Sequence, residues 1–536
     1  MNLLLPLIPL LPALMLLALV WPLTRARVMG ALWLAPLPAL VIAPFAMGTS
    51  LVLYPGGLKF TLLLDAPGGG LLGGAALLWS AAGLFARAQM GTGPAAKRFA
   101  AWWLLTQSGC LGVFITGDLL SFYLAFAVVS LAAFGLVAHD GTPKARRAGG
   151  LYLLLAVLGE IALLLAFALL HGRAGTESIA IADVAPVLRT TPGGPVIAML
   201  LILGFGLKMG LMPLHVWLPV AHPAAPAPGS AVLSGAIIKA GVIGLIRFLP
   251  FDGLPVADGV LLAGLGFATA YWGVAMGLTQ RNPKTILAYS SVSQMGVVAA
   301  TLGMGLLLGL AETPVHTAFY ALHHMLAKGA LFLGVGLALA TGPAGRALVL
   351  PLALLLALGF GGLPPTGGAL AKAAVKPEFG AGLAAMAAML STFGSTALML
   401  HFVHRLRAAM VAAPSAAPGW GLGVPWLVLG VAALILPWAL YGAVTGKAPS
   451  GDWSAATILP VAAGAAFAVL WTRIGPRVPE APAGDLLVFA QRGSPWRDAL
   501  ARAVAVVEEA ARPWPVAGIA LLLLILAFYG LIGFSS

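Results

Sequence analysis

Residues 207–217 read LKMGLMPLHVW, and they lie in an apolar run that begins near Pro195. The stretch places Lys208 inside a helix that is apolar enough to cross a membrane, and Pro213 then interrupts that helix. A charged side chain at the centre of a membrane helix costs about 3 kcal/mol on insertion scales. A lysine in this setting therefore indicates a functional site with a partner elsewhere in the chain.

The composition around this stretch excludes a soluble globular protein. Of the 536 residues, 61% are hydrophobic and 8% are charged, and the mean hydropathy is +1.02. Apolar stretches of about 18 to 25 residues, long enough to cross a hydrocarbon core of ~30 Å as helices, recur along the whole length. The sequence predicts an all-α polytopic membrane protein with about sixteen transmembrane helices.

The predicted spans are residues 2–22, 28–47, 69–88, 98–117, 118–138, 149–171, 194–221, 229–249, 257–279, 284–309, 315–341, 348–376, 380–406, 422–445, 455–472 and 515–534. The first stretch lacks a basic leader and a small-residue cleavage site, so we expect a retained helix. Cys110 is the only cysteine, which excludes an internal disulfide or an iron–sulfur cluster held by this chain alone.

The net charge of +13 reflects membrane topology and not a nucleic-acid partner, because the basic residues lie in short loops. Loops after odd-numbered spans hold nineteen of the 29 Lys and Arg residues, and loops after even-numbered spans hold six. The positive-inside rule then predicts cytoplasmic odd loops and two periplasmic termini in the inner (cytoplasmic) cell membrane.

Four basic residues remain deep inside the predicted spans: Lys208, Lys239, Lys328 and Lys372. Only one acid, Glu160, is similarly deep, so the lysines cannot all be neutralised by ion pairs within the membrane. Lys372 follows Pro364 and Pro365, a second interruption of an apolar span. Broken helices at membrane depth are tolerated where they line a polar cavity.

Polar residues on the same segments favour a hydrated path. The possible relay groups are His215, His222, Ser234 and His323, with His324 four residues before Lys328. A lone histidine is more often a structural hydrogen-bond partner between helices, and that interpretation stays open for His316 and His323. A buried lysine that a carboxylate approaches and leaves can bind and release a proton. The row of sites therefore predicts proton transfer.

Four segments resemble a known family: GLKMGLMPLHVWLPVAHPAAPAPGSAVLSGAIIKAGVIGLIRF, TILAYSSVSQMG, HHMLAKGALFLGVG and GLPPTGGALAK. They are similar to the proton-conducting antiporter-like subunits shared by respiratory complex I, membrane-bound hydrogenases and Mrp sodium/proton antiporters. The resemblance covers roughly residues 97–406. It implies two inverted five-helix repeats, at 97–249 and 250–406, with the seventh and twelfth helices broken. Residues 1–96 would hold three helices and a periplasmic hairpin-like loop, and 407–536 three helices with a short lateral amphipathic helix near 494–513.

The resemblance also implies roles for individual residues. Lys208 matches the lysine of broken helix 7, Lys239 that of helix 8, His324 and Lys328 the pair on helix 11, and Lys372 the terminal lysine on broken helix 12. Glu160 resembles an acid on helix 6 of one complex I member. Together these residues would form a proton-conducting axis in the membrane plane, coupled to a partner's redox reaction or to sodium exchange.

The sequence departs from the family pattern at four positions. Ala127, in FYLAFAVVS, stands where the family has the helix 5 glutamate that pairs with the helix 7 lysine. Ser234 replaces a histidine, Tyr320 stands where some members have a histidine, and Val220 replaces the aspartate of WLPDAH. We expect Glu160 to replace the missing partner of Lys208, within direct or one-water reach.

The leading hypothesis is a proton-translocating subunit of a complex I-like, hydrogenase-like or Mrp-like complex. Its partners would be other membrane subunits, including antiporter-like paralogues and a redox or ion-exchange module. The sequence has no phosphate-binding motif and no metal or flavin constellation, so we expect no cofactor and no redox chemistry in this chain. Two alternatives remain: a degenerate structural subunit that does not conduct, and a membrane subunit for ion or inorganic carbon uptake.

Overall fold

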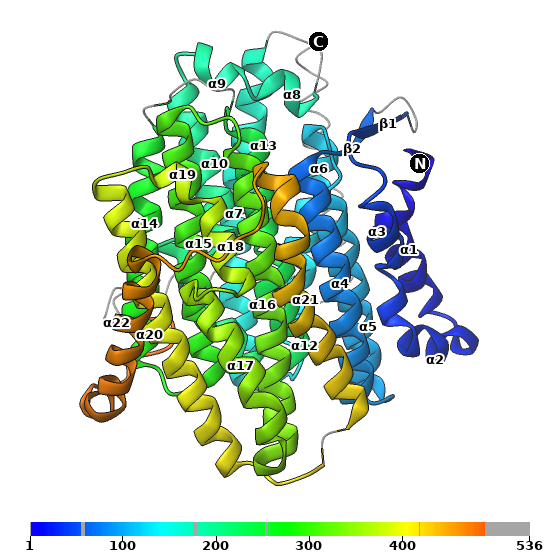
Figure 1. The fold of residues 1–536 in the computed structure, drawn as a ribbon. Coiled ribbons are helices and arrows are strands. Elements are labelled where there is room, and N and C mark those ends of the chain that lie inside the picture. Colours follow the sequence, from blue (N-terminus) through cyan, green and yellow to red (C-terminus); the bar gives the residue numbers. More distant parts are fainter. Residues whose placement is uncertain are drawn as a thin grey trace, which may run out of the picture.

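The computed structural model describes residues 2–487 apart from 55–58, 175–178, 252–255, 257 and 418. These residues form a bundle of long, roughly parallel helices with one small hairpin at its edge (Figure 1). The predicted span at 515–534 and the lateral helix near 494–513 lie outside the described residues. The bundle confirms the helical polytopic class.

The first residues form short elements. They are η1 (Asn2–Leu4), α1 (Leu7–Ala18), α2 (Pro22–Gly30), η2 (Leu32–Leu34) and α3 (Leu37–Ile42), followed by the antiparallel strands β1 (Thr49–Leu53) and β2 (Phe60–Leu64). The helix predicted at 2–22 is therefore shorter, over Asn2–Ala18, and the one predicted at 28–47 is part of a helix pair bent by 64°. Proline explains this, because Pro6, Pro22 and Pro36 each lie where a helix begins and lack the N–H that a helix interior needs.

The first half of the bundle contains α4 (Ala66–Met90), α5 (Pro94–Val113), α6 (Leu119–Val137), α7 (Pro143–Ala174), α8 (Ile181–Val184), α9 (Val187–Thr190), α10 (Gly194–Met209), η4 (Leu214–Val216), α11 (Trp217–Ala224), α12 (Ala227–Val232), the π-helical turn η5 (Leu233–Ile237) and α13 (Lys239–Phe248). The second half contains α14 (Gly259–Thr279), α15 (Pro283–Leu308), α16 (Thr313–Thr341), η6 (Gly342–Gly345), α17 (Arg346–Gly361), α18 (Gly367–Ala374), α19 (Lys376–Phe379), α20 (Leu383–Ala412), α21 (Trp420–Thr445), α22 (Ala455–Ile474) and η7 (Gly475–Arg477).

Among the described residues, eleven helical segments are long and apolar enough to cross a membrane, or twelve if the bent pair Pro22–Gly30 and Leu32–Ile42 is one span. The predicted number of sixteen stays a prediction, because the described residues do not include the span at 515–534. One of the eleven, Thr313–Gly361, joins α16 and α17, which the sequence divides into two spans. The helix α5 lies in the predicted span 98–117 and packs against α6, but it is not among the eleven.

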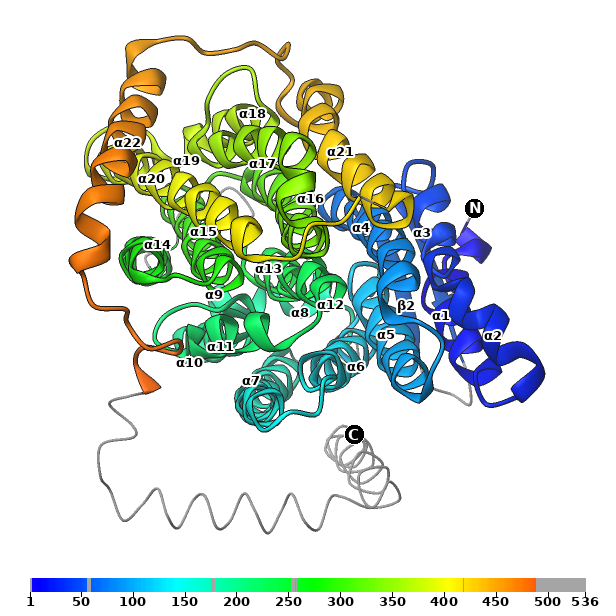
Figure 2. The ribbon, with the colours of Figure 1, turned by 90° about the horizontal axis from the view of Figure 1, so that it is seen from below.

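The bundle has two ends, which we call the hairpin face and the basic face. The hairpin face carries β1, β2, α8 and α9 (Figure 1), and the basic face carries the connections 91–93, 138–142 and 280–282. Seen along the helices, α1 to α3 lie at one edge beside α4 and α5, and α22 lies at the opposite edge beside α20 (Figure 2). The helices α12, α13 and α16 lie between these edges.

Small residues let neighbouring helices approach closely. Gly259, Gly266 and Gly273 repeat every seven residues along α14 and face the backbone of α15. A Cβ at Gly266 would overlap the backbone nitrogen of Ala300, so any larger residue would force the two helices apart. Such contacts between small residues are a common source of helix association in membranes. They fix α15, which carries several of the predicted polar residues.

An arginine at the hairpin face ties three helix ends together. Arg247, at the end of α13, forms two hydrogen bonds of 2.9 and 3.0 Å to Asp65, the N-cap residue of α4. The same guanidinium donates to the carbonyl groups of Val113, Phe114 and Thr116 after α5. Because every acceptor is a carboxylate or an orphan carbonyl, this charge is fully satisfied and serves the fold.

Candidate functional site

Two predicted spans are broken by the same backbone device. The helix α10 ends at Gly210, which has a left-handed φ of 83°, and Pro213 lies in the gap before η4. The helix α17 ends at Gly362, with φ of 79°, and Pro364 and Pro365 lie in the gap before α18. Glycine adopts a left-handed conformation without steric cost, and the prolines prevent the helix from continuing. Lys208 precedes the first break, and Lys372 follows the second.

Lys208 is enclosed by aromatic side chains. Its ammonium lies 3.3 Å from the hydroxyl of Tyr152 on α7, and it lies over the rings of Phe126 and Tyr152 at 5.3 and 5.5 Å. The Tyr152 hydroxyl donates in turn to the carbonyl of Ser130, at 2.7 Å. A cavity of about 10 Å³ adjoins Lys208, between Tyr152, Ala156, Leu207 and Trp217. This space is about that of one water molecule.

Glu160 forms no direct ion pair with Lys208, the first of the two forms that the expected contact could take. Both side chains are buried, yet no carboxylate oxygen of Glu160 lies within 4.0 Å of the Lys208 ammonium, and neither oxygen has a hydrogen-bond partner among the described residues. Tyr152, Ala156 and Glu160 share one face of α7 at four-residue spacing, and the first two line the small cavity beside Lys208. Contact between Glu160 and Lys208 through one water stays a prediction.

A compact polar cluster lies between the two breaks. The ammonium of Lys239 lies 2.5 Å from Nδ1 of His324 and donates to the carbonyl of Ser234 at 2.8 Å. The hydroxyls of Ser234 and Ser291 are 2.7 Å apart. The ammonium of Lys328 donates to the carbonyl of Leu287 at 3.0 Å, and it lies 5.0 Å from the ring centre of Phe360.

The lysines of this cluster have no buried acid as a partner. Lys239 and Lys328 have side chains with no solvent exposure, and no carboxylate of the described part of the chain lies within 4.0 Å of either. A charged lysine at this depth needs hydrogen-bond acceptors, and each ammonium has one backbone carbonyl as an acceptor. The cluster therefore holds two buried lysines whose described hydrogen-bond partners are carbonyl and imidazole groups.

Tyr320 connects the cluster to the second break. It lies one turn before His324 on the same face of α16 and donates to the side-chain carbonyl of Gln294 at 2.5 Å. Gln294 donates in turn to the hydroxyl of Ser395 on α20, at 2.9 Å. Tyr320 also lines the cavity that contains Lys372. The sequence marked Tyr320 only as a departure from the family pattern.

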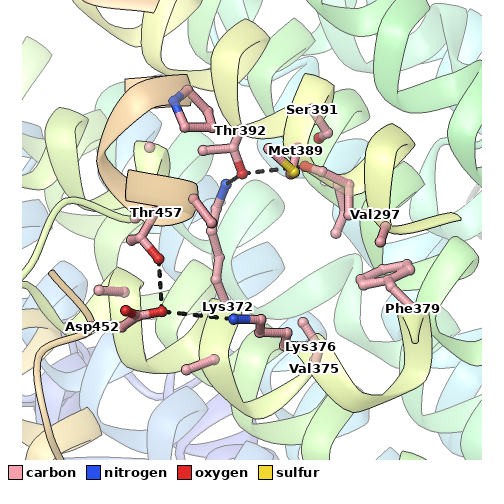
Figure 3. Close-up of a pocket in the computed structure, with 18 of the residues that line it drawn as sticks. Val297, Lys372, Val375, Lys376, Phe379, Met389, Ser391, Thr392, Asp452 and Thr457 are labelled. Atoms are coloured by element: carbon pink, nitrogen blue, oxygen red, sulfur yellow. Dashed lines mark hydrogen bonds and ion pairs between the residues drawn. The ribbon is translucent and has the colours of Figure 1, made fainter. Parts of the chain in front are cut away.

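Lys372 faces the larger of the two cavities described here, with a volume of about 210 Å³. Its ammonium donates to the hydroxyl of Thr392 on α20, at 2.8 Å, and Figure 3 shows the side chain extending to that residue. Ser391 and Tyr320 line the same space, which is large enough for several waters. Lys372 is partly buried, and its depth in the membrane stays a prediction.

A charged pair lies at the edge of this cavity, near the hairpin face. The Lys376 ammonium is 3.7 Å from a carboxylate oxygen of Asp452, which also accepts from Thr457 at 2.8 Å (Figure 3). Hydrogen bonds from Ser454 and Thr457 lower the pKa of Asp452 to about 2, so its carboxylate is ionised at neutral pH. The pair marks a water-accessible mouth beside Lys372.

Two of the predicted relay histidines, His222 and His323, form no hydrogen bond with the central cluster among the described residues. His222 stacks on Phe332 with ring centres 4.5 Å apart, and neither ring nitrogen has a partner among the described residues. His323 lies beside Phe360, with ring centres 5.7 Å apart. His215 lies in η4, where its Nε2 is 3.1 Å from a carboxylate oxygen of Asp485.

Sequence reasoning missed two buried acids that contact histidines. Asp485 follows α22 in sequence, outside every predicted span, yet it is only 7% exposed and contacts His215. Glu378, on α19, is 1% exposed and lies 2.7 Å from Nδ1 of His316. No hydropathy signal marks either residue, because each lies in a short connection that folds back onto the bundle. Within the described ranges, no group of three or more His, Cys, Asp or Glu is placed to hold a metal ion.

Several known proteins are similar to this chain in sequence. The chain is 34% identical to hydrogenase-4 component B of Escherichia coli (strain K12) over 40% of this chain and 33% of that protein. It is 33% identical to NADH-quinone oxidoreductase subunit N of Desulforudis audaxviator over 58% of this chain and 65% of that protein. For a Na(+)/H(+) antiporter subunit of Alkalihalophilus pseudofirmus the identity is 30%, over 44% of this chain and 48% of that protein. The matched regions thus span about one third to two thirds of these relatives.

Solved structures share the fold. The Mrp complex from Dietzia sp. DQ12-45-1b contains a chain that matches 99% of this one, with a TM-score of 0.77 and 23% identity, over 63% of that chain. A chain of the membrane-bound sulfane sulfur reductase, an archaeal respiratory membrane complex, matches 97% with a TM-score of 0.69 and 20% identity, over 99% of that chain.

A family model settles the assignment. The model for the NADH:quinone oxidoreductase/Mrp antiporter transmembrane family matches residues 116–401, which is more than half of the chain. These residues include both breaks, the central cluster and Lys372. The resemblance drawn from the four sequence segments is therefore confirmed, and this chain is a member of the NADH:quinone oxidoreductase/Mrp antiporter transmembrane family.

Proposed function

We propose that this chain conducts protons through the membrane as one subunit of a complex I-like, hydrogenase-like or Mrp-like ion-translocating complex. The conducting residues are Glu160, Lys208, Lys239, His324, Lys328 and Lys372. His215, His222, Ser234 and His323 are the additional relay candidates. The partners are other membrane subunits, including antiporter-like paralogues and a redox or ion-exchange module.

One observation carries the proposal: polar side chains follow one another on α16 from the central cluster to an open cavity. Lys239 contacts His324 directly, Tyr320 lies one turn from His324, and Tyr320 lines the same cavity as Lys372. A proton on Lys239 can pass to Nδ1 of His324. The opposite nitrogen, Nε2, is buried and has no partner among the described residues, so a water can accept its proton.

The proposed orientation places the basic face in the cytoplasm. The excess of Lys and Arg in the odd loops supports this orientation in the inner (cytoplasmic) membrane, with the amino terminus on the periplasmic side. The cavity at Lys372 then opens toward the periplasm, because Lys376 and Asp452 lie near the hairpin face. A proton that reaches Lys372 is released there.

The second candidate is a structural subunit that does not conduct. Ala127 and the absence of a direct Glu160–Lys208 ion pair favour it, because Lys208 lacks the carboxylate that would switch it. Both candidates share the fold and the membrane partners. They differ in whether protons cross this chain.

Proton flux in the purified complex tests the two candidates. The chain is tagged and purified with its partners from native membranes, the partners are identified by mass spectrometry, and the whole complex is reconstituted into vesicles with a pH-sensitive dye. We expect proton movement when the partner reaction is started, and at least a tenfold loss of it in Lys239→Met. A complex whose partner reaction runs normally while Lys239→Met moves protons at the wild-type rate would establish the structural role.

A further inference from the structure

The segment that follows α22 and η7 carries a buried carboxylate into the bundle. Asp485 is 7% exposed. One of its carboxylate oxygens accepts from Nε1 of Trp272 at 2.9 Å and from the hydroxyl of Tyr289 at 3.2 Å, and it lies 3.1 Å from Nε2 of His215. The three partners come from α14, α15 and η4. Tyr289 lies six residues into α15, about 9 Å from the basic face.

Specific contacts fix this segment against the basic face. The side chain of Gln280 donates to the carbonyl of Ala481 at 2.9 Å, and the N–H of Ala481 donates to Thr279 at 3.3 Å. Gly484 has φ of +85°, a left-handed conformation that turns the chain inward just before Asp485. A Cβ at Gly484 would lie 2.8 Å from a methyl group of Val220. Val220 stands where the family pattern has aspartate, so the segment brings a carboxylate beside a position that lacks one.

Asp485 supplies a fixed negative charge to His215. Burial acts to raise the pKa of Asp485, but the hydrogen bond and charge of His215 and the N–H groups of Leu486 and Trp272 lower it below its usual value. His215 is fully buried in the break between α10 and α11. An imidazolium at this depth needs a counter-charge, and a carboxylate on Nε2 also fixes the orientation of the ring.

Two buried polar atoms on η4 and α15 have no hydrogen-bond partner among the described residues. They are Nδ1 of His215 and the hydroxyl oxygen of Ser293. Ser293 lies one turn beyond Tyr289 on α15, deeper in the bundle as seen from the basic face. Buried polar atoms of this kind are usually satisfied by water.

We propose that His215 and Asp485 form the proton-loading pair on the basic face, with His215 binding the proton and Asp485 acting as its positioning residue and counter-charge. The inference rests on the proposed proton conduction and adds the group that takes up the proton. The proton transferred to His215 comes from water at the basic face, and it leaves through Nδ1 to a second water on the path to the central cluster. Only O–H bonds of water and N–H bonds of His215 form or break in this transfer.

Other titratable groups near the pair are few. Tyr289 contacts Asp485, and its ring centre lies 6.4 Å from that of His215. Lys208 on α10, His222 on α11 and Lys284 on α15 lie on neighbouring elements, but none of them forms a hydrogen bond or ion pair with His215. Glu480, earlier in the segment, pairs with Arg281 at 3.7 Å on the surface.

The test compares Asp485→Asn with Asp485→Glu in the whole complex, reconstituted into vesicles. Asparagine keeps an oxygen that accepts from Trp272 and Tyr289 but removes the charge. We expect the pH of half-maximal proton uptake to fall by about one unit. At pH 8 this corresponds to a loss of about tenfold, with a much smaller loss at pH 6. Asp485→Glu keeps the charge, so it should retain most of the wild-type proton flux. Glu480→Gln is the matched control, and its pH profile should equal that of the wild type.

Hydrogen exchange of residues 478–487, followed by mass spectrometry, separates a proton-loading role from a purely structural one. We expect unchanged protection of this segment in Asp485→Asn. An unchanged pH profile of proton uptake in that variant overturns the inference. An equal loss of proton flux at all pH values, together with faster hydrogen exchange, also overturns it, because the aspartate then only holds the segment in place. If the wild-type complex itself moves no protons, the proposed function fails.

Discussion

Lys208 and Lys372 each lie beside a break in a membrane span, yet the protein surrounds them differently. Lys208 is 4% exposed, has the Tyr152 hydroxyl as its hydrogen-bond partner, and adjoins a cavity of about 10 Å³. Lys372 is partly exposed and faces a cavity of about 210 Å³ near Lys376 and Asp452. The same backbone device, a left-handed glycine followed by proline, therefore produces one sealed site and one open site.

The difference shows that a helix break alone does not hydrate a lysine. At the first break the aromatic rings of Phe126, Tyr152 and Trp217 fill the space that the break creates. At the second break residues of the connection between α21 and α22 line a cavity that has room for several waters. In the proposed path, Lys372 exchanges protons with a face of the membrane, and Lys208 exchanges only with its immediate neighbours.

The largest effect is expected at the open site. Lys372→Met keeps the aliphatic stem but removes the amine that faces this cavity beside the break, so coupled proton movement should fall by more than tenfold. Dye-monitored vesicles containing the complex measure the rate, and gel filtration checks that the complex stays assembled. Lys376→Gln, one turn further at the cavity mouth, is the control and should retain most of the flux. Normal acidification by Lys372→Met would contradict the assignment of this lysine.

A smaller effect is expected for the link between the central cluster and the open site. Tyr320→Phe removes the hydroxyl that donates to Gln294. The proton flux should fall several-fold, because one lost hydrogen bond costs a free energy of ~1 kcal/mol. Tyr271→Phe is a matched control, because the Tyr271 hydroxyl donates to the carbonyl of Ala387, away from the lysines. Equal rates for the two variants would show that protons bypass Tyr320.

The sealed site should respond more weakly and as a unit. Lys208→Met and Glu160→Gln should each lower the proton flux about two- to threefold. The double variant should have a flux no lower than that of the less active single variant. The vesicle assay gives all three rates. Losses that multiply in the double variant would show that Glu160 and Lys208 act independently, with no water between them.

The smallest effects on proton flux are expected for the two glycines, Gly210 and Gly362, at which the two helices break. Gly210→Ala and Gly362→Ala both force a left-handed φ on alanine, which costs about 1–2 kcal/mol. Thermal unfolding of the purified protein should therefore shift down in both variants. The added Cβ would overlap a methyl group of Leu218 in the first case and lie 2.9 Å from the stem of Lys372 in the second. Only Gly362→Ala should lower the flux per folded molecule, and an equal loss in Gly210→Ala would contradict a sealed first break.

Most helices followed from hydropathy, and the failures have a physical reason. Apolar stretches of membrane length became α4, α6, α7 and the later helices, because a chain in lipid must satisfy its backbone internally. The stretches at 2–22 and 28–47 have the same apolar character but are interrupted by proline, and they became short helices. Hydropathy averages over a window, whereas one missing N–H ends a helix locally.

The candidate site was predicted less completely than the helices. The sequence marked the lysines and His324, because a charge inside an apolar run is visible without any structure. It could not mark Asp485, which lies in a polar connection 270 residues after His215. It could not mark the link from Tyr320 through Gln294 to Ser395 either, because these residues lie on three different helices.

The sequence by itself determined that this protein crosses a membrane many times, belongs to the antiporter-like family and carries ionisable groups at membrane depth. Those properties follow from local composition and from short motifs. Only the tertiary structure decided which lysine meets water, which histidine meets a carboxylate, and that Glu160 stays outside ion-pair distance of Lys208. The physical reason is that hydration and charge pairing act over a few ångströms between side chains that are distant along the chain.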